Sequence, residues 1–190
     1  MTATSDSLSN HFLISMPHLH DPHFSHTVTY ICDHSEYGAM GLVVNQPLKI
    51  NLSELCSHLG LPCTSVEDQQ RSIYSGGPVK PERGYVLHRC DTPSEWPTSH
   101  CLTDDIYLST SLDAIEAAAE GRFAHNYLII LGCAGWGPGQ LEQEMSDNAW
   151  LSCPANSDIL FSIPAEDRLQ AAAALLGVNL NLLTAHTGHA

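Results

Sequence analysis

The sequence predicts an α+β domain organised around a curved, mainly antiparallel sheet. Short apolar segments typical of strands occur in clusters, and single helical segments interrupt them without a regular βαβ repeat. The 190 residues suit one domain, and 43% of them are hydrophobic, so a core can form without disulfides or metals. We expect residues 11–190 to form this domain, after a polar, disordered tail at residues 1–10.

The predicted strands are short and bounded by turn residues. Residues 27–33 alternate apolar and polar side chains, as a half-buried strand does, and a turn at 35–38 joins them to the next strand as a hairpin. Residues 127–131 are apolar without alternation, which indicates a central strand covered on both faces. The predicted strands are residues 12–16, 27–33, 38–45, 73–74, 84–88, 106–109, 127–131 and 149–153, with a surface loop at 90–101.

The first two predicted helices each begin at a capping pair. Asn51 with Glu54 begins one helix, which Gly60 ends, and Thr110 with Asp113 begins the other. The spacing of apolar residues predicts the buried faces as Leu52, Leu55, Cys56 and Leu59 in the first helix, and Leu112, Ile115 and Ala119 in the second.

Two later helices are predicted from their first turns. Pro138 and Gly139 begin a short helix in which Leu141 and Met145 share a face, while Glu142 and Glu144 point elsewhere. The last helix has Pro164 at its first position, acidic residues in its first turn and Gly177 at its end. Its predicted buried stripe is Leu169, Ala172, Ala173 and Leu176.

The charge balance argues against direct binding to nucleic acid. Seven Lys and Arg residues stand against 21 Asp and Glu residues, a net charge of −14, whereas nucleic-acid-binding domains have a basic surface. The only basic grouping is Lys80, Arg83 and Arg89, so any contact with an anion is expected there. The alternative is that these charges only solvate the surface and offset neighbouring acids.

The cysteine pattern and the hydropathy favour a cytoplasmic protein without a membrane span. The seven cysteines are never spaced as CxxC, so neither a zinc ribbon nor a redox dithiol is indicated. No basic segment followed by an apolar core begins the chain, and no apolar segment reaches about 18 residues. We expect no cofactor and no structural metal.

The most unusual segment is residues 132–150, GCAGWGPGQLEQEMSDNAW. Gly135, Gly137 and Gly139 lie between a strand and a helix, as in a dinucleotide-binding loop, but Gln140 stands where GxGxxG requires its third glycine. We therefore favour a tight strand–turn–helix in which these glycines allow close backbone packing and Trp136 and Trp150 act as anchors.

Two other groups of residues are candidates, one for a metal site and one for a catalytic nucleophile. The histidines at 18, 20, 23 and 26 could bind a metal, although solvated loop histidines are the more common outcome. Cys133, with His34 or His88, and Ser75 are candidate nucleophiles, but no GxSxG motif is present and buried cysteines are usually structural. No catalytic residue is assigned.

Four segments together resemble one family. They are FLISMP, FSHTVTYICDHSEYGAMGLVVNQP, YSGGPVKPERGYVLHR and GCAGWGPGQLEQEMSDNAW, and the similarity runs from about His11 to the C-terminus. The chain resembles the AlgH (YqgE/AlgH) family of bacterial proteins. The resemblance implies a bifurcated sheet closed into a flattened pseudo-barrel with helices outside. It also implies a link to transcriptional regulation, without an established activity or agreed catalytic residues.

The leading functional hypothesis is a cytoplasmic, non-enzymatic regulatory or interaction protein that acts through a protein partner or a small ligand. Any control of transcription would be indirect, and the oligomeric state is left open. The alternative is an enzyme or small-molecule-binding protein with a pocket where the SGGP and AGWGPGQ segments meet. The candidate ligand or partner surface consists of Asn45, Ser75, Gly76, Gly77, Trp136, Gln140, Glu144 and Asn148.

Overall fold

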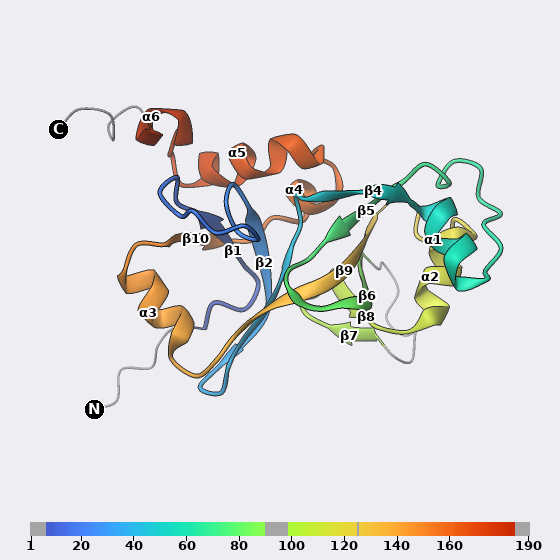
Figure 1. Ribbon diagram of the computed structural model, residues 1–190, viewed down its shortest axis with the longest axis horizontal. Coiled ribbons are helices and arrows are strands. Elements are labelled where there is room, and N and C mark those ends of the chain that lie inside the picture. Colours follow the sequence, from blue (N-terminus) through green and yellow to red (C-terminus); the bar gives the residue numbers. More distant parts are fainter. Residues whose placement is uncertain (1–6, 90–98, 125, 185–190) are drawn as a thin grey trace.

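The computed structural model describes residues 7–89, 99–124 and 126–184 (Figure 1). The fold is α+β, as predicted, and its curled, mainly antiparallel sheet forms a half-barrel. The strands are β1 His11–Ser15, β2 Val28–Ser35, β3 Gly38–Val43, β4 Pro47–Asn51, β5 Ser72–Ser75, β6 Val79–Arg89, β7 Ser99–Cys101, β8 Ile106–Ser109, β9 Tyr127–Trp136 and β10 Trp150–Pro154. Part of the predicted surface loop, residues 99–101, is strand β7, and its residues 90–98 lie outside the described ranges.

Strand β9 is where the sheet divides (Figure 1). Its first half pairs with β6 on one side and, in parallel, with β5 on the other, which leads to β4. Its second half pairs with β3, which continues through β2 and β1 to β10. The bifurcated sheet is therefore confirmed. The predicted central position of residues 127–131 is also confirmed, because β9 has partners on both edges and Leu128, Ile129 and Ile130 are buried.

The helices are α1 Leu52–Leu59, α2 Leu112–Ala119, α3 Gln140–Ser146, α4 Ser157–Phe161, α5 Ala165–Leu175 and α6 Leu180–Thr184. In α1 the predicted capping box is present, since Asn51 accepts from the amide of Glu54 and the Glu54 carboxylate accepts from the amide of Asn51. Gly60 ends this helix with a φ of 69°. Within the described ranges, no helix combines the length and hydropathy needed to cross a membrane.

Three hydrophobic clusters hold the fold together. Helix α5 covers one face of β1 and β2, where Phe12, Ile14 and Tyr30 are buried. Helices α1 and α2 cover the far end of the sheet around Ile73 and Ile129. Helix α3 and the loop after β1 cover the other face of β1 and β2. The third cluster consists of Leu13, Ile31, Ala134, Trp136, Leu141 and Trp150.

Several predicted helix details are wrong. The residue that caps α2 is Ser111, not Thr110, and its side chain makes no capping hydrogen bond. Pro164 precedes α5 as its N-cap instead of occupying the first turn. Leu59, Leu112 and Leu176 are 43%, 47% and 40% exposed. These leucines fit the helical spacing, but each lies at or next to a helix end, where its side chain is only partly covered.

Part of the expected tail is packed. Residues 1–6 lie outside the described ranges, whereas Ser7 to Asn10 contact β2. The amide of Asn10 donates to the carbonyl of Ile31 at 2.9 Å, and Leu8 packs against the cluster beneath α3. The backbone of this segment is therefore satisfied by β2, which a polar composition alone did not predict.

Candidate functional site

Three aromatic rings from separate parts of the chain meet beside α3. Trp136 ends β9, Trp150 begins β10, and Phe24 comes from the loop between β1 and β2. The two indole centroids are 6.2 Å apart at 78°, and the Phe24 ring lies 5.6 Å from that of Trp150 and 6.2 Å from that of Trp136. Although β9 and β10 do not pair with each other, the strand order and the turn through α3 bring the two tryptophans into one cluster with Leu13 of β1 and Ile31 of β2.

The Glu144 carboxylate joins both indoles. Its Oε2 accepts the Nε1–H of Trp136 at 2.9 Å and that of Trp150 at 2.8 Å. Its Oε1 accepts from the Gln140 amide at 3.0 Å, and Gln140 Oε1 in turn accepts from the backbone of Gly137. Charge-assisted bonds of this kind are stronger than neutral ones, so they hold the carboxylate and both rings in one arrangement.

A cavity of about 290 Å³ lies against this group. Aromatic and aliphatic side chains partly enclose it, and among the described residues the ionisable side chains that line it are those of Asp21 and Glu144. The described residues of its lining are Leu19, Asp21, Phe24, Gly135, Trp136, Gln140, Glu144, Ala149 and Trp150. A concave, mainly apolar space with a few oriented polar groups has the character of a small-molecule site.

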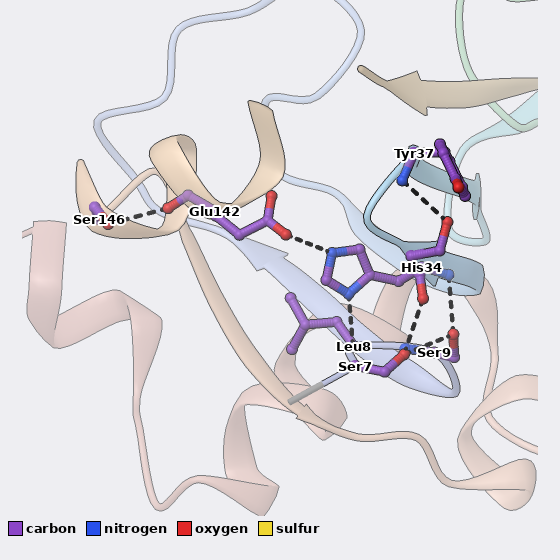
Figure 2. A network of polar contacts seen from close by, with 8 residues as sticks. Ser7, Leu8, Ser9, His34, Tyr37, Glu142 and Ser146 are labelled. Atoms are coloured by element: carbon purple, nitrogen blue, oxygen red, sulfur yellow. Dashed lines mark hydrogen bonds and ion pairs between the residues drawn. The ribbon is translucent and has the colours of Figure 1, made fainter. Parts of the chain in front are cut away.

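A second carboxylate anchors α3 from another side (Figure 2). His34 Nε2 lies 2.9 Å from Glu142 Oε1, and His34 Nδ1 lies 2.9 Å from the amide nitrogen of Leu8. Because a backbone N–H can only donate, Nδ1 is the acceptor and Nε2 carries the proton donated to Glu142. The backbone amide of Glu142, with a smaller contribution from His34, lowers the pKa of the Glu142 carboxyl group.

The backbone of His34 extends this network to the start of the chain (Figure 2). Its carbonyl accepts from the Ser7 hydroxyl at 3.1 Å, and its amide donates to Ser9 Oγ at 2.9 Å. The N-terminal segment, β2 and α3 are thus connected through one buried histidine.

Of the predicted surface, Trp136, Gln140 and Glu144 come together at this cavity. Asn148, which has a φ of 57°, makes the turn between α3 and β10 and does not line it. Asn45 lies at another place, where its side chain accepts from the amide of Val28 and donates to the carbonyl of His26. Asn45 therefore links the segment that follows β3 to the start of β2.

Ser75, Gly76 and Gly77 pack on the middle of β9 and do not line the cavity. A Cβ on Gly76 would lie 2.3 Å from the carbonyl oxygen of Gly132, and one on Gly77 would lie 2.5 Å from the carbonyl carbon of Cys133. Gly77 also has a φ of 142°. The close backbone approach is therefore between the SGGP turn and residues 132–134.

The predicted close backbone packing at Gly135, Gly137 and Gly139 is wrong. A Cβ on Gly135 or Gly137 would meet no atom closer than 3.8 Å, and one on Gly139 would meet nothing within 4 Å. Gly139 is needed for a different reason, because it precedes α3 with a φ of 73°. Glu142 and Glu144, which were expected to point elsewhere than the face shared by Leu141 and Met145, each bind a buried side chain.

The structure gathers no metal-binding group from the histidine loop. Among the described residues, no three His, Cys, Asp or Glu side chains form a cluster suited to a metal ion. Cys133 is 5% exposed, and its sulfur accepts from the Tyr85 hydroxyl at 3.5 Å. His88 is fully buried between Phe123 and Tyr107, where desolvation lowers its pKa. Arg89 lies against Asp105 and Asp158, away from the exposed Lys80 and Arg83.

The sequence interpretation missed the contribution of the histidine loop. Leu19, Asp21 and Phe24 line the cavity, although only the histidines of this loop were considered as ligands. The available signal was Asp21 before Pro22, because an aspartate there can accept from the amides two and three residues later and so fix the turn that carries Phe24.

Comparisons with known proteins agree with this fold. The profile of the family described as AlgH-like matches residues 12–181. A UPF0301 protein of Pseudomonas aeruginosa (strain UCBPP-PA14) is 52% identical over 187 residues, with 96% of each chain covered. A UPF0301 protein of Marinomonas sp. (strain MWYL1) is 46% identical over 189 residues, with 100% of each chain covered.

Two solved structures are similar. The solution structure of the AlgH protein from Pseudomonas aeruginosa has a TM-score of 0.78 at 49% identity and covers 100% of both chains. A crystal structure of a protein from Corynebacterium diphtheriae has a TM-score of 0.73 at 19% identity, covering 96% of this chain and 94% of the other. This second similarity concerns the fold alone.

Proposed function

The chain belongs to the AlgH-like family, and from this premise we propose that it is a non-enzymatic, cytoplasmic regulatory protein that responds to a small ligand. The observation that carries the proposal is the Glu144 carboxylate fixed by two indole N–H groups at the wall of a cavity. A preformed polar group in an apolar space fixes the orientation of a ligand without a cost of rearrangement.

The position of α3 supports a regulatory role. Glu144 contacts the cavity, while Glu142, two residues away, holds His34 and through it the segment before β1. A ligand that bound one arrangement of α3 more tightly than another would therefore bias contacts on β2 and the N-terminal segment. In this proposal α3, held through Glu142 and Glu144, couples the cavity to β2 and the N-terminal segment.

An indirect effect on transcription fits the charge. The net charge of −14 opposes phosphate backbones, and Arg89 is already placed between two carboxylates. A cytoplasmic location is supported by the cysteines, because the six within the described ranges are all free thiols.

The test is a titration of ¹⁵N-labelled protein with a library of small metabolites of different charge. We expect at least one class to shift the indole Nε1–H signals of Trp136 and Trp150 in a saturable manner. A library without any such shift would contradict the proposal. In a parallel experiment, a specific DNA complex weakened by salt and by Arg83→Ala would contradict indirect regulation.

A further inference from the structure

The charges that line the cavity restrict the class of ligand. Two carboxylic residues line it, Asp21 and Glu144, and no Lys or Arg is present among the described residues of its lining. The whole chain adds a net charge of −14. An anionic ligand would lose its hydration without gaining an opposite charge, which makes its transfer into this space unfavourable.

The two carboxylates have unused hydrogen-bond capacity. Asp21 Oδ1 accepts from the amides of His23 at 2.8 Å and Phe24 at 3.2 Å, while Oδ2 has no partner in the part of the chain that the structure describes. Glu144 Oε2 is filled by the two indoles, but Oε1 accepts only from Gln140 and keeps one lone pair. A ligand that fills these open acceptor positions must supply hydrogen-bond donors.

The remaining wall is aromatic and aliphatic. Phe24, Trp136 and Trp150 supply ring surface, and Leu19 and Ala149 supply aliphatic contacts. Aromatic rings attract organic cations through their quadrupoles, and a site of this kind also accommodates an alkyl chain. A volume of about 290 Å³ admits only a small molecule.

We propose that this cavity binds a small primary alkylammonium ion, with the ammonium group between Asp21 and Glu144 and the alkyl chain against the three rings. This inference rests on the proposed function, because it names the ligand class of the same cavity. Three N–H donors of an ammonium group match the open positions on Asp21 Oδ2 and Glu144 Oε1.

The test compares three probes of equal length that differ in charge: n-pentylammonium, 1-pentanol and pentanoate. The background is Trp96→Phe, since Trp96 is the only tryptophan besides Trp136 and Trp150, and the readout is the indole Nε1–H signals. We expect saturable binding of the ammonium ion at least about tenfold tighter than that of the alcohol, and none of the carboxylate.

Two variants locate the charge. Asp21→Asn keeps an oxygen that can accept from the amides of His23 and Phe24 but removes the negative charge, so it should weaken pentylammonium binding about tenfold while preserving the fold. Asp147→Asn, which removes an exposed carboxylate at the end of the same helix and outside the cavity lining, should leave binding unchanged.

The outcomes separate the two proposals. Equal binding of alcohol and ammonium, preference for pentanoate, or unchanged affinity in Asp21→Asn would overturn the alkylammonium inference and still leave the cavity as a ligand site. If none of the three probes shifts either indole signal, the alkylammonium inference fails. A further failure of the full metabolite library would remove the proposed function as well.

Discussion

His34 and Glu142 join β2 to α3, with Nε2 of the ring 2.9 Å from Oε1 of the carboxylate. The histidine is 8% exposed, whereas the Glu142 side chain is 41% exposed. The buried ring therefore has a fixed tautomer, whereas solvent screens the charge of the exposed Glu142 carboxylate. Most of the structural effect of this contact comes from the buried ring and its bond to Leu8, because a hydrogen bond to a solvent-exposed carboxylate contributes little.

His34→Ala should lower the free energy of unfolding by about 1–3 kcal/mol, because it removes a buried partner of the Leu8 amide. Hydrogen exchange should accelerate in residues 7–10, which pack along β2. The control is His20→Ala, an exposed residue in the loop after β1. Equal exchange protection in the two variants would show that His34 does not hold the N-terminal segment.

Glu144→Ala should lower the free energy of unfolding more than a change on the exposed face of α3 does. It leaves the indole N–H groups of Trp136 and Trp150 without their acceptor, and the cost is about 2 kcal/mol if water only partly replaces it. Gln143→Ala on the exposed face of the same helix should change stability by less than about 0.5 kcal/mol. Denaturant titration with both variants checks the difference.

Gly76→Ala and Gly77→Ala should each cost about 3 kcal/mol or more, since the added methyl group would overlap the backbone of β9 and cannot be accommodated by a rotamer change. Gly137→Ala is the matched control, because its Cβ would lie 3.9 Å from the nearest atom. Thermal unfolding of the three variants measures these differences in stability. A similar melting temperature for Gly77→Ala and Gly137→Ala would contradict the close packing of the SGGP turn.

His88 should make the protein less stable as the pH falls below about 7. Burial lowers its pKa in the folded state, while the unfolded chain has the ordinary value of about 6.5. Between these two pKa values the unfolded chain binds more protons, so the free energy of unfolding decreases with decreasing pH.

The check is the free energy of unfolding from pH 7.5 to pH 5 for the wild type and for His88→Leu. The variant should have a smaller pH dependence, because it lacks this group, and the difference between the two proteins isolates His88 from the other histidines. An unchanged pH dependence in His88→Leu would rule out the effect.

The sequence by itself determined the family and most of the elements, although strands β4 and β7 and helices α4 and α6 were not predicted. Residues 127–131 are apolar at every position, and this composition indicates a strand covered on both faces, as β9 is. The Asn51–Glu54 capping box and the turn between β2 and β3 are local interactions, so their residue types were sufficient to predict them. Helix ends were less well predicted, because Leu59 and Leu112 satisfy the helical period but are 43% and 47% exposed.

The sequence named Trp136, Gln140 and Glu144 as candidates, but the tertiary structure was needed to place them around one cavity with the loop after β1. Phe24, Trp136 and Trp150 come from three distant segments, and their meeting depends on the order of strands around the division at β9. The spacing of Glu144 on α3 gave no sign that its carboxylate would turn inward, since helical position specifies a direction but not the partner found there. Long-range contacts of this kind are properties of the assembled sheet.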